Sequence, residues 1–243
     1  IDDVKVGSLE QIATDPSISA PEEIATSDIV DSPPLILYDD FENAAFNGVV
    51  DTNKWLREED YPEFCGVSQQ EGVLIFDQQL NPEDAIGCKL FVQPSQTVYE
   101  QLESFEAMVK LSSNHNGKPL NQGIEFARHI QDGERWFFCG LDVKNGELVA
   151  HLLISQWSSE AGYEIEFSNG ILADYDTWYK LRLAVTPGTP TTVSCFVDDK
   201  VVGTTSPTDA DILPGGVFTR RVTAYRSEDA FATAYVDDVK IGE

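Results

Sequence analysis

Short alternating or apolar runs, each ended by turn residues, recur from residue 35 to the end of the chain. Asn-Gly pairs at 116–117, 145–146 and 169–170 and an Asp-Gly pair at 132–133 lie between the runs, and these residues tolerate the positive φ that tight hairpins need. No helical period persists there over about 12 residues, so the pattern predicts about a dozen strands. We therefore expect an all-β fold, an antiparallel two-sheet jelly-roll sandwich with an extended N-terminal arm.

The runs that we predict as strands alternate or are continuously apolar, as half-buried and buried strands do. Asp198 and Asp199 separate two of them and predict a further turn. The predicted strands are Leu35–Tyr38, Val73–Phe76, Lys89–Val92, Ser104–Leu111, Gly123–His129, Trp136–Val143, Glu147–Ile154, Tyr163–Phe167, Trp178–Val185, Thr191–Val197, Lys200–Thr204, Val217–Tyr225 and Phe231–Ile241.

Residues 1–34 differ from this pattern. They contain eight acidic residues, four Pro and a single Lys, and after the first six residues no run is apolar enough to bury. This composition is typical of an extended linker or arm. We therefore divide the chain into an acidic arm or inter-domain linker, residues 1–34, and a sandwich domain, residues 35–243.

The first seven residues, IDDVKVG, repeat almost unchanged as residues 236–242, VDDVKIG. The N-terminal copy could be the last strand of a preceding similar domain, which would make the chain one unit of a tandem array. It could instead be a strand donated to a like subunit through Ile1, Val4 and Val6. Chance similarity of two short strands is the third explanation.

The balance of 16 Lys and Arg against 42 Asp and Glu gives a net charge of −26. Nucleic-acid backbones and anionic membranes both require a basic patch, so this charge argues against either partner. No stretch approaches the roughly 18 apolar residues of a membrane span.

The chain contains four cysteines, an even number that is compatible with two disulfides in an oxidising compartment. Four buried free thiols are the alternative. Four cysteines allow three pairings, and the sequence does not decide among them. Cys65 with Cys88 and Cys139 with Cys195 is the pairing that we take for testing. On this basis we expect a secreted or cell-surface protein.

Several segments resemble the concanavalin A-like, laminin-G-like jelly rolls of extracellular proteins. The entry strand and first turn of that superfamily resemble YDDFE at 38–42 with DTNKW at 51–55. Its central strand resembles WYKLRL at 178–183. VSCFVDDKVVG at 193–203 resembles a characteristic hairpin, and YVDDV at 235–239 the closing strand. The cysteine placement is most similar to that of bacterial surface modules. The resemblance implies the fold and leaves function open, because this sandwich carries lectins, glycosidases, sensors and structural proteins.

The resemblance also implies a structural calcium ion, since the entry segment and the closing strand of this superfamily commonly meet around one. Carboxylates are suitable ligands for this cation. Adjacent Asp residues point to opposite faces of a strand, so only one of each pair can face a given site. Acids solvated at the sheet edge are the alternative. The matching residues are Asp39, Asp40, Glu42, Asp237 and Asp238.

The carboxylate pattern of a glycosidase is absent. Such enzymes need two suitably spaced acids, and laminarinase-like relatives place theirs along one strand face. Glu164 and Glu166 share a face, but position 168 is Ser, and the strand with Glu125 has a single acid. We interpret these carboxylates as solvated. No GxSxG elbow marks a nucleophile either.

Stacking on a sugar requires exposed aromatic side chains. Trp157, in the polar segment 155–159, is the best candidate, with Tyr163 and Tyr175 nearby in sequence. Packing of these rings over a sheet end is the alternative. Trp55 and Trp178 match positions at which the family buries an aromatic residue, so we expect both in the core.

These observations lead us to expect a non-catalytic structural or adhesive module, not an enzyme. It would belong to a tandem array or assemble with like subunits. A carbohydrate-binding module with a polysaccharide partner is the alternative, and a divergent glycoside hydrolase is the third possibility.

Overall fold

The computed structural model describes residues 34–59, 61–92, 97–99, 103–118, 120–130, 133–158, 162–168, 170–186, 191–206 and 216–242. The predicted arm, residues 1–34, and its contact residues Ile1, Val4 and Val6 lie outside this part, apart from residue 34. The described residues form two antiparallel sheets, as the alternating pattern predicts, with only two short 3-10 helices, Ala44–Phe46 (η1) and Pro62–Phe64 (η2). None of them forms a helix long and apolar enough to cross a membrane.

The first sheet has the order β15-β14-β13-β7-β17-β4-β3, and β1 pairs with β17 beside this path. The entry strand and the closing strand are therefore neighbours, as in the predicted jelly roll. The strands are β1 (Ile36–Asp39), β3 (Cys65–Gln70), β4 (Val73–Gln78), β7 (Glu103–Leu111), β13 (Tyr179–Thr186), β14 (Thr192–Val197), β15 (Lys200–Thr205) and β17 (Ala232–Gly242).

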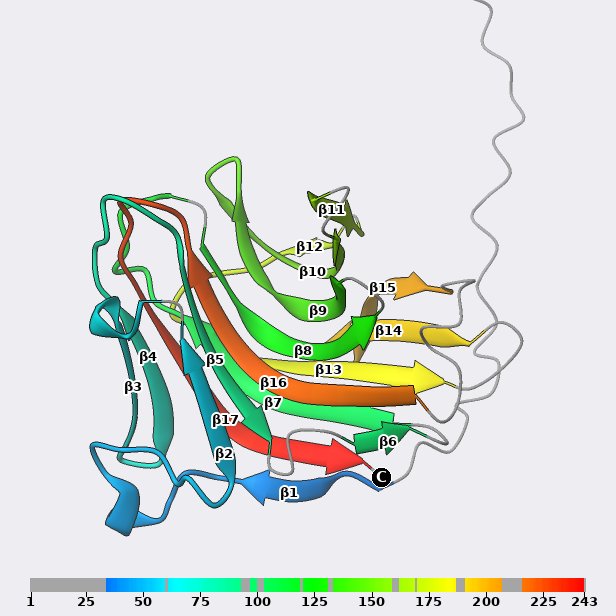
Figure 1. Cartoon of the computed structure of the whole chain (residues 1–243), viewed down its shortest axis with the longest axis horizontal. Coiled ribbons are helices and arrows are strands. Elements are labelled where there is room, and N and C mark those ends of the chain that lie inside the picture. The colour runs from blue at the N-terminus through cyan, green and yellow to red at the C-terminus, as the bar shows by residue number, and fades with distance from the viewer. Residues whose placement is uncertain are drawn as a thin grey trace, which may run out of the picture. The chain divides into compact units, whose positions relative to one another are not determined.

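The second sheet has the order β11-β10-β9-β8-β16-β5-β2, with β12 paired to β10 and β6 to β16. Figure 1 shows β8, β9 and β16 bowed, with the hollow side turned away from the first sheet. The strands are β2 (Trp55–Glu59), β5 (Ile86–Val92), β6 (Thr97–Tyr99), β8 (Leu120–Ile130), β9 (Gly133–Lys144), β10 (Glu147–Ser158), β11 (Gly162–Phe167), β12 (Ile171–Leu172) and β16 (Gly216–Arg226).

The core lies between the sheets and consists of alternate residues from both. On β7, Phe105, Ala107 and Val109 are fully buried, while the second sheet contributes residues such as Val222 and Ala224. This alternation matches the period of two along a strand. The opposite faces of the two sheets are therefore the surfaces available for function.

Two disulfides join the sheets. Cys65 on β3 is bonded to Cys88 on β5, and Cys139 on β9 is bonded to Cys195 on β14. Each bond crosses the sandwich from the first sheet to the second. The predicted pairing is confirmed.

Tight turns set the register of the hairpins. Asn145 and Gly146, both with positive φ, are the only residues between β9 and β10. Asp198 and Asp199 join β14 to β15 in the same way. Two-residue loops with two positive φ values match the twist of antiparallel strands.

Candidate functional site

The concave face of the second sheet, the face directed away from the core, carries a polar set of side chains. On β16, Val222 and Ala224 belong to the core. Thr219, Arg221, Thr223 and Tyr225 therefore point the other way, because successive side chains alternate between faces.

A buried ion pair lies on this face. The Arg221 Nε donates to a carboxylate oxygen of Glu125 on β8, and only 1% of Arg221 and 4% of Glu125 are exposed. The guanidinium carbon lies 5.5 Å from the Phe91 ring centroid and 5.6 Å from that of Trp136. The prediction of a solvated Glu125 is wrong, because Arg221 is opposite it in the sheet register.

Beside this pair, His151 on β10 is fully buried between two charged groups of β9. The Lys144 Nζ lies 2.9 Å from its Nδ1, and a carboxylate oxygen of Asp142 lies 3.4 Å from its Nε2. This geometry fits an imidazole whose Nδ1 accepts from Lys144 and whose Nε2–H faces Asp142. Burial lowers the pKa of Lys144, and the nearby Asp142 partly opposes this shift.

Half-buried side chains complete the concave face. Tyr225, Asn121 and Asp142 are opposite one another on β16, β8 and β9, so they form one row across the sheet. The Lys89 Nζ lies 5.8 Å from the Tyr225 ring centroid. The buried Asn121 Oδ1 has no hydrogen-bond partner within the described chain. Aromatic surface beside amide, carboxylate and ammonium groups suits a ligand rich in hydroxyl groups.

The residues that the sequence analysis predicted to bind sugar are not part of this row. Trp157 and Tyr163 are opposite one another in the β10–β11 pairing, and their side chains lie outside the described part. Tyr175, before β13, packs partly against the core, and its ring centroid lies 4.7 Å from that of His115. The row of Tyr225, Asn121 and Asp142 is identified from the register of β8, β9 and β16. The sequence pattern does not predict that register.

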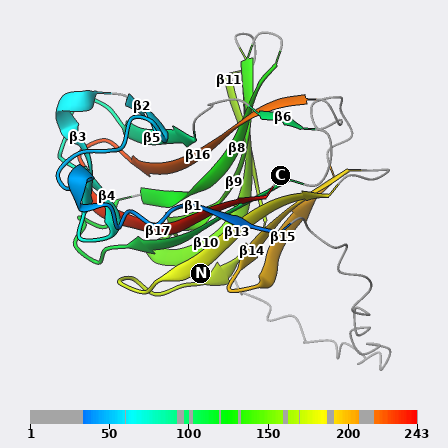
Figure 2. The ribbon, with the colours of Figure 1, turned by 90° about the horizontal axis from the view of Figure 1, so that it is seen from below.

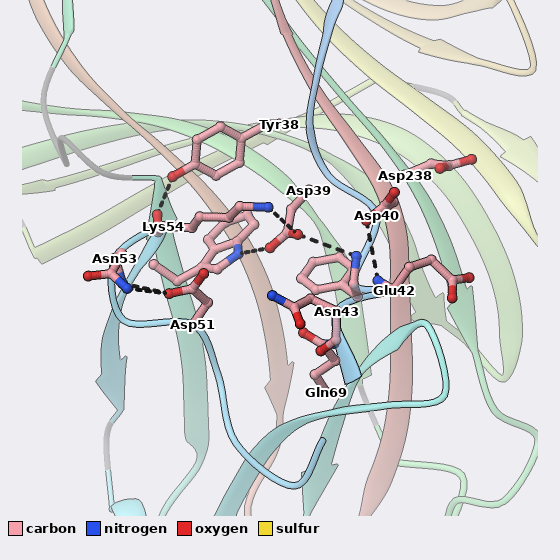
Figure 3. A network of polar contacts seen from close by, with 12 residues as sticks. Tyr38, Asp39, Asp40, Glu42, Asn43, Asp51, Asn53, Lys54, Gln69 and Asp238 are labelled. Atoms are coloured by element: carbon pink, nitrogen blue, oxygen red, sulfur yellow. Dashed lines mark hydrogen bonds and ion pairs between the residues drawn. The ribbon is translucent and has the colours of Figure 1, made fainter. Parts of the chain in front are cut away.

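The first of the predicted calcium ligands has a structural role. The Asp39 carboxylate accepts from Lys54 Nζ at 2.8 Å and from Trp55 Nε1 at 2.6 Å (Figure 3). The Asp40 side chain accepts from the backbone of Glu42 at 3.2 Å. Asp39 therefore fixes the first turn against the buried Trp55, and its oxygens already have donors.

The other predicted calcium ligands lie close enough to repel one another. Burial raises the pKa of Asp237 to about 6, and Asp238, Glu42 and Asp40 contribute in the same direction. Within the described ranges, however, no three carboxylate, imidazole or thiol groups are arranged to hold a metal ion. The residues as arranged do not form a complete site, and calcium stays a prediction.

Trp178 is a further correction, since it is not in the core. It is half-buried and packs against Tyr235, with ring centroids 6.4 Å apart, on the outer face of the first sheet. Trp55, by contrast, is buried as predicted.

The comparisons with known proteins concern the fold. No known protein family and no curated protein matches the sequence. Among solved structures, a glycoside hydrolase family protein from Mycobacterium thermorestibile is similar, with a TM-score of 0.60, 12% identity, and 84% of this chain and 98% of that chain covered. The chain has the concanavalin A-like jelly-roll fold.

Some of the similar structures contain saccharides. The alginate lyase Aly36B in complex with alginate trisaccharide has a TM-score of 0.59 and 10% identity, with 87% of this chain and 98% of that chain covered. LamA from Zobellia galactanivorans, in complex with laminaritriose and laminaritetraose, has a TM-score of 0.59 and 13% identity. The match covers 87% of this chain and 100% of that chain.

These neighbours correct the expected function. We expected a non-catalytic structural or adhesive module and no enzyme, whereas the similar structures are mostly glycoside hydrolases and a polysaccharide lyase. That expectation was wrong because the entry, central and closing strands are common to the whole fold and carry no information about its use.

Proposed function

We propose that the protein is a carbohydrate-active protein that binds a polysaccharide chain across the concave face of its second sheet. The row of Tyr225, Asn121 and Asp142 is the observation that supports this proposal most directly. An aromatic ring packs against the apolar face of a sugar, while the amide and carboxylate bind its hydroxyl groups. Lys89 and Lys144, both half-buried, flank the row and favour a neutral or anionic chain.

We also propose that the protein works outside the cell. Both disulfides join the two sheets, and such bonds persist in oxidising compartments. Outside the cell, the protein would have access to polysaccharides that are too large to enter it.

Titration calorimetry with laminaritetraose and alginate trisaccharide tests the binding proposal. We expect Tyr225→Ala to weaken binding about tenfold, the effect of losing one aromatic contact. Tyr61→Ala is the matched control and should leave the affinity unchanged. It removes a ring that is 42% exposed and whose hydroxyl donates to Asp84. Equal affinities for wild type and Tyr225→Ala would contradict the proposal.

The Lys144–His151 contact favours a second, catalytic candidate: β-elimination of a uronate-containing polysaccharide. The lowered pKa of Lys144 increases the fraction of neutral amine that can act as a base. The amine would take the proton from the carbon next to the uronate carboxyl group. The bond from the neighbouring carbon to the leaving oxygen would then break as the double bond forms, and that oxygen would take up a proton.

Ultraviolet absorbance of the unsaturated uronate product, measured on alginate, tests this candidate. Lys144→Arg keeps the positive charge but cannot act as a base near neutral pH, so we expect retained binding without product. New reducing ends without unsaturation would indicate hydrolysis instead and reject elimination.

A further inference from the structure

A cavity lies at one end of the first sheet, away from the row of Tyr225, Asn121 and Asp142. Its volume is about 550 Å³, within the range of ligand sites. It opens beside the end of β4 and the start of β17, strands that lie side by side (Figure 2). Its walls include Glu63, Phe64, Asp77, Gln79, Asn114 and Phe231.

A disulfide and a backbone hydrogen bond fix the chain segments that line this cavity. Phe64 precedes Cys65, whose disulfide to Cys88 joins the sheets at this end. The backbone N–H of Gln79 donates to the carbonyl of Phe64 at 2.8 Å. The cavity is therefore largely formed before any ligand arrives, which reduces the entropy cost of binding.

The lining combines acceptors with apolar surface. The Asp77 carboxylate accepts from the Gln79 amide at 2.8 Å, so both groups are already oriented toward each other. Phe64 and Phe231 are half-buried and present ring surface beside them. None of the described lining residues is Lys or Arg, whereas Asp77 and Glu63 are both acidic. These two carboxylates would repel an anionic sugar.

An aromatic surface continues from the cavity along β17. Tyr235 follows Thr233, a lining residue, by two positions, so both lie on the same face about 7 Å apart. Its ring packs against Trp178. The Lys110 Nζ lies 4.3 Å from the Tyr235 centroid and 4.8 Å from the Trp178 centroid, so the ammonium group links the two half-buried rings.

We infer that this cavity and the Tyr235–Trp178 surface form a second saccharide-binding site, in which the acidic cavity selects a neutral sugar unit. Asp77 and Asn114 would bind hydroxyl groups, Phe231 would pack against a pyranose ring, and the chain would continue over Tyr235. The inference goes beyond the concave-face proposal and does not depend on it, because none of these residues faces the second sheet's outer side.

Titration calorimetry with laminaritetraose tests the inference in two variants. We expect two sites in wild type. Tyr225→Ala should weaken only the concave-face site and Phe231→Ala only the second site, each about tenfold. In the Tyr225→Ala background, adding Asp77→Asn should weaken binding at the second site about tenfold, as expected for a lost charged hydrogen bond. Glu71→Gln, the same change of charge in the exposed β3–β4 turn, is the matched control and should have no effect.

Several results would overturn the inference. A single site in wild type that Tyr225→Ala weakens would leave only the concave face. Binding of glucosamine tetraose but not laminaritetraose would assign the cavity to amines, and loss of binding with chelator would assign it to a cation. Phe231→Leu keeps the apolar volume and should also weaken the second site. If Phe231→Ala fails to fold, retained binding in Phe231→Leu would reject the role of the ring.

Discussion

At the scale of single residues, the Glu125–Arg221 pair has the largest predicted effect on stability. Glu125→Gln would leave a guanidinium that is 1% exposed without its carboxylate. Removing one partner of a buried pair costs about 3–5 kcal/mol, so we expect the free energy of unfolding to fall by about that amount. Urea denaturation measures it.

The matched control is an exposed pair. Asp199→Asn breaks the ion pair with Lys180, in which the Asp199 side chain is 67% exposed, and should cost less than about 1 kcal/mol. Replacing both buried partners, as Glu125→Gln with Arg221→Met, should restore part of the loss. Equal costs for Glu125→Gln and Asp199→Asn would contradict the buried pairing.

Asp237 predicts a pH dependence of stability. Its pKa in the folded protein is raised from 3.8 to about 6, so the stability associated with its protonated form is complete below about pH 4 and is lost as the pH rises through about 6. Asp237→Asn removes this titration. We expect the variant to be more stable than wild type near pH 7.5 and equal to it near pH 4.

Calcium is tested by the same pair of proteins. A cation bound by Asp237 and its neighbours would raise the wild-type melting temperature and leave that of Asp237→Asn unchanged. A wild-type midpoint that is insensitive to both calcium and chelator would reject the predicted site. Thermal unfolding in each condition is the measurement.

At the scale of elements, the disulfides tie particular strands together. Cys139–Cys195 closes a longer segment, 56 residues, than Cys65–Cys88, 23 residues. Chain-entropy arithmetic gives about 4 and about 3 kcal/mol for the two bonds. We expect Cys139→Ala with Cys195→Ala to destabilise more in denaturant unfolding than Cys65→Ala with Cys88→Ala. The reverse order would show that packing at each site outweighs loop length.

Most strands were predictable because the turns between them consist of residue types that favour turns. Asn145–Gly146 and Asp198–Asp199 are residues that accept positive φ, and the predicted hairpins around them form. β3 was missed because its turn, Glu71–Gly72, begins with a residue that rarely has positive φ, here +50°. β2 was missed because WLREE, with three consecutive charged residues after Leu56, does not alternate.

At the scale of the whole molecule, the candidate site was only partly predictable. The two-residue turn after Lys144 fixes the β9–β10 register, so the proximity of Asp142 and His151 could have been inferred. Glu125 and Arg221 are 96 residues apart, and only the strand order of the sheet brings them together. The sequence therefore predicts hairpin neighbours but not the rows of side chains that cross several strands.

The net charge of −26 predicts how the association rate of a charged ligand depends on salt. Long-range repulsion should slow the approach of alginate trisaccharide, although Lys89 and Lys144 flank the concave face. Salt shortens the reach of that repulsion from about 30 Å at 0.01 M to about 8 Å at 0.15 M. We therefore expect the association rate of alginate trisaccharide to rise over this range, while that of uncharged laminaritetraose stays constant. Stopped-flow tryptophan fluorescence measures both rates. An association rate for alginate trisaccharide that falls with salt would instead show that the local field of the two lysines outweighs the charge of the whole molecule.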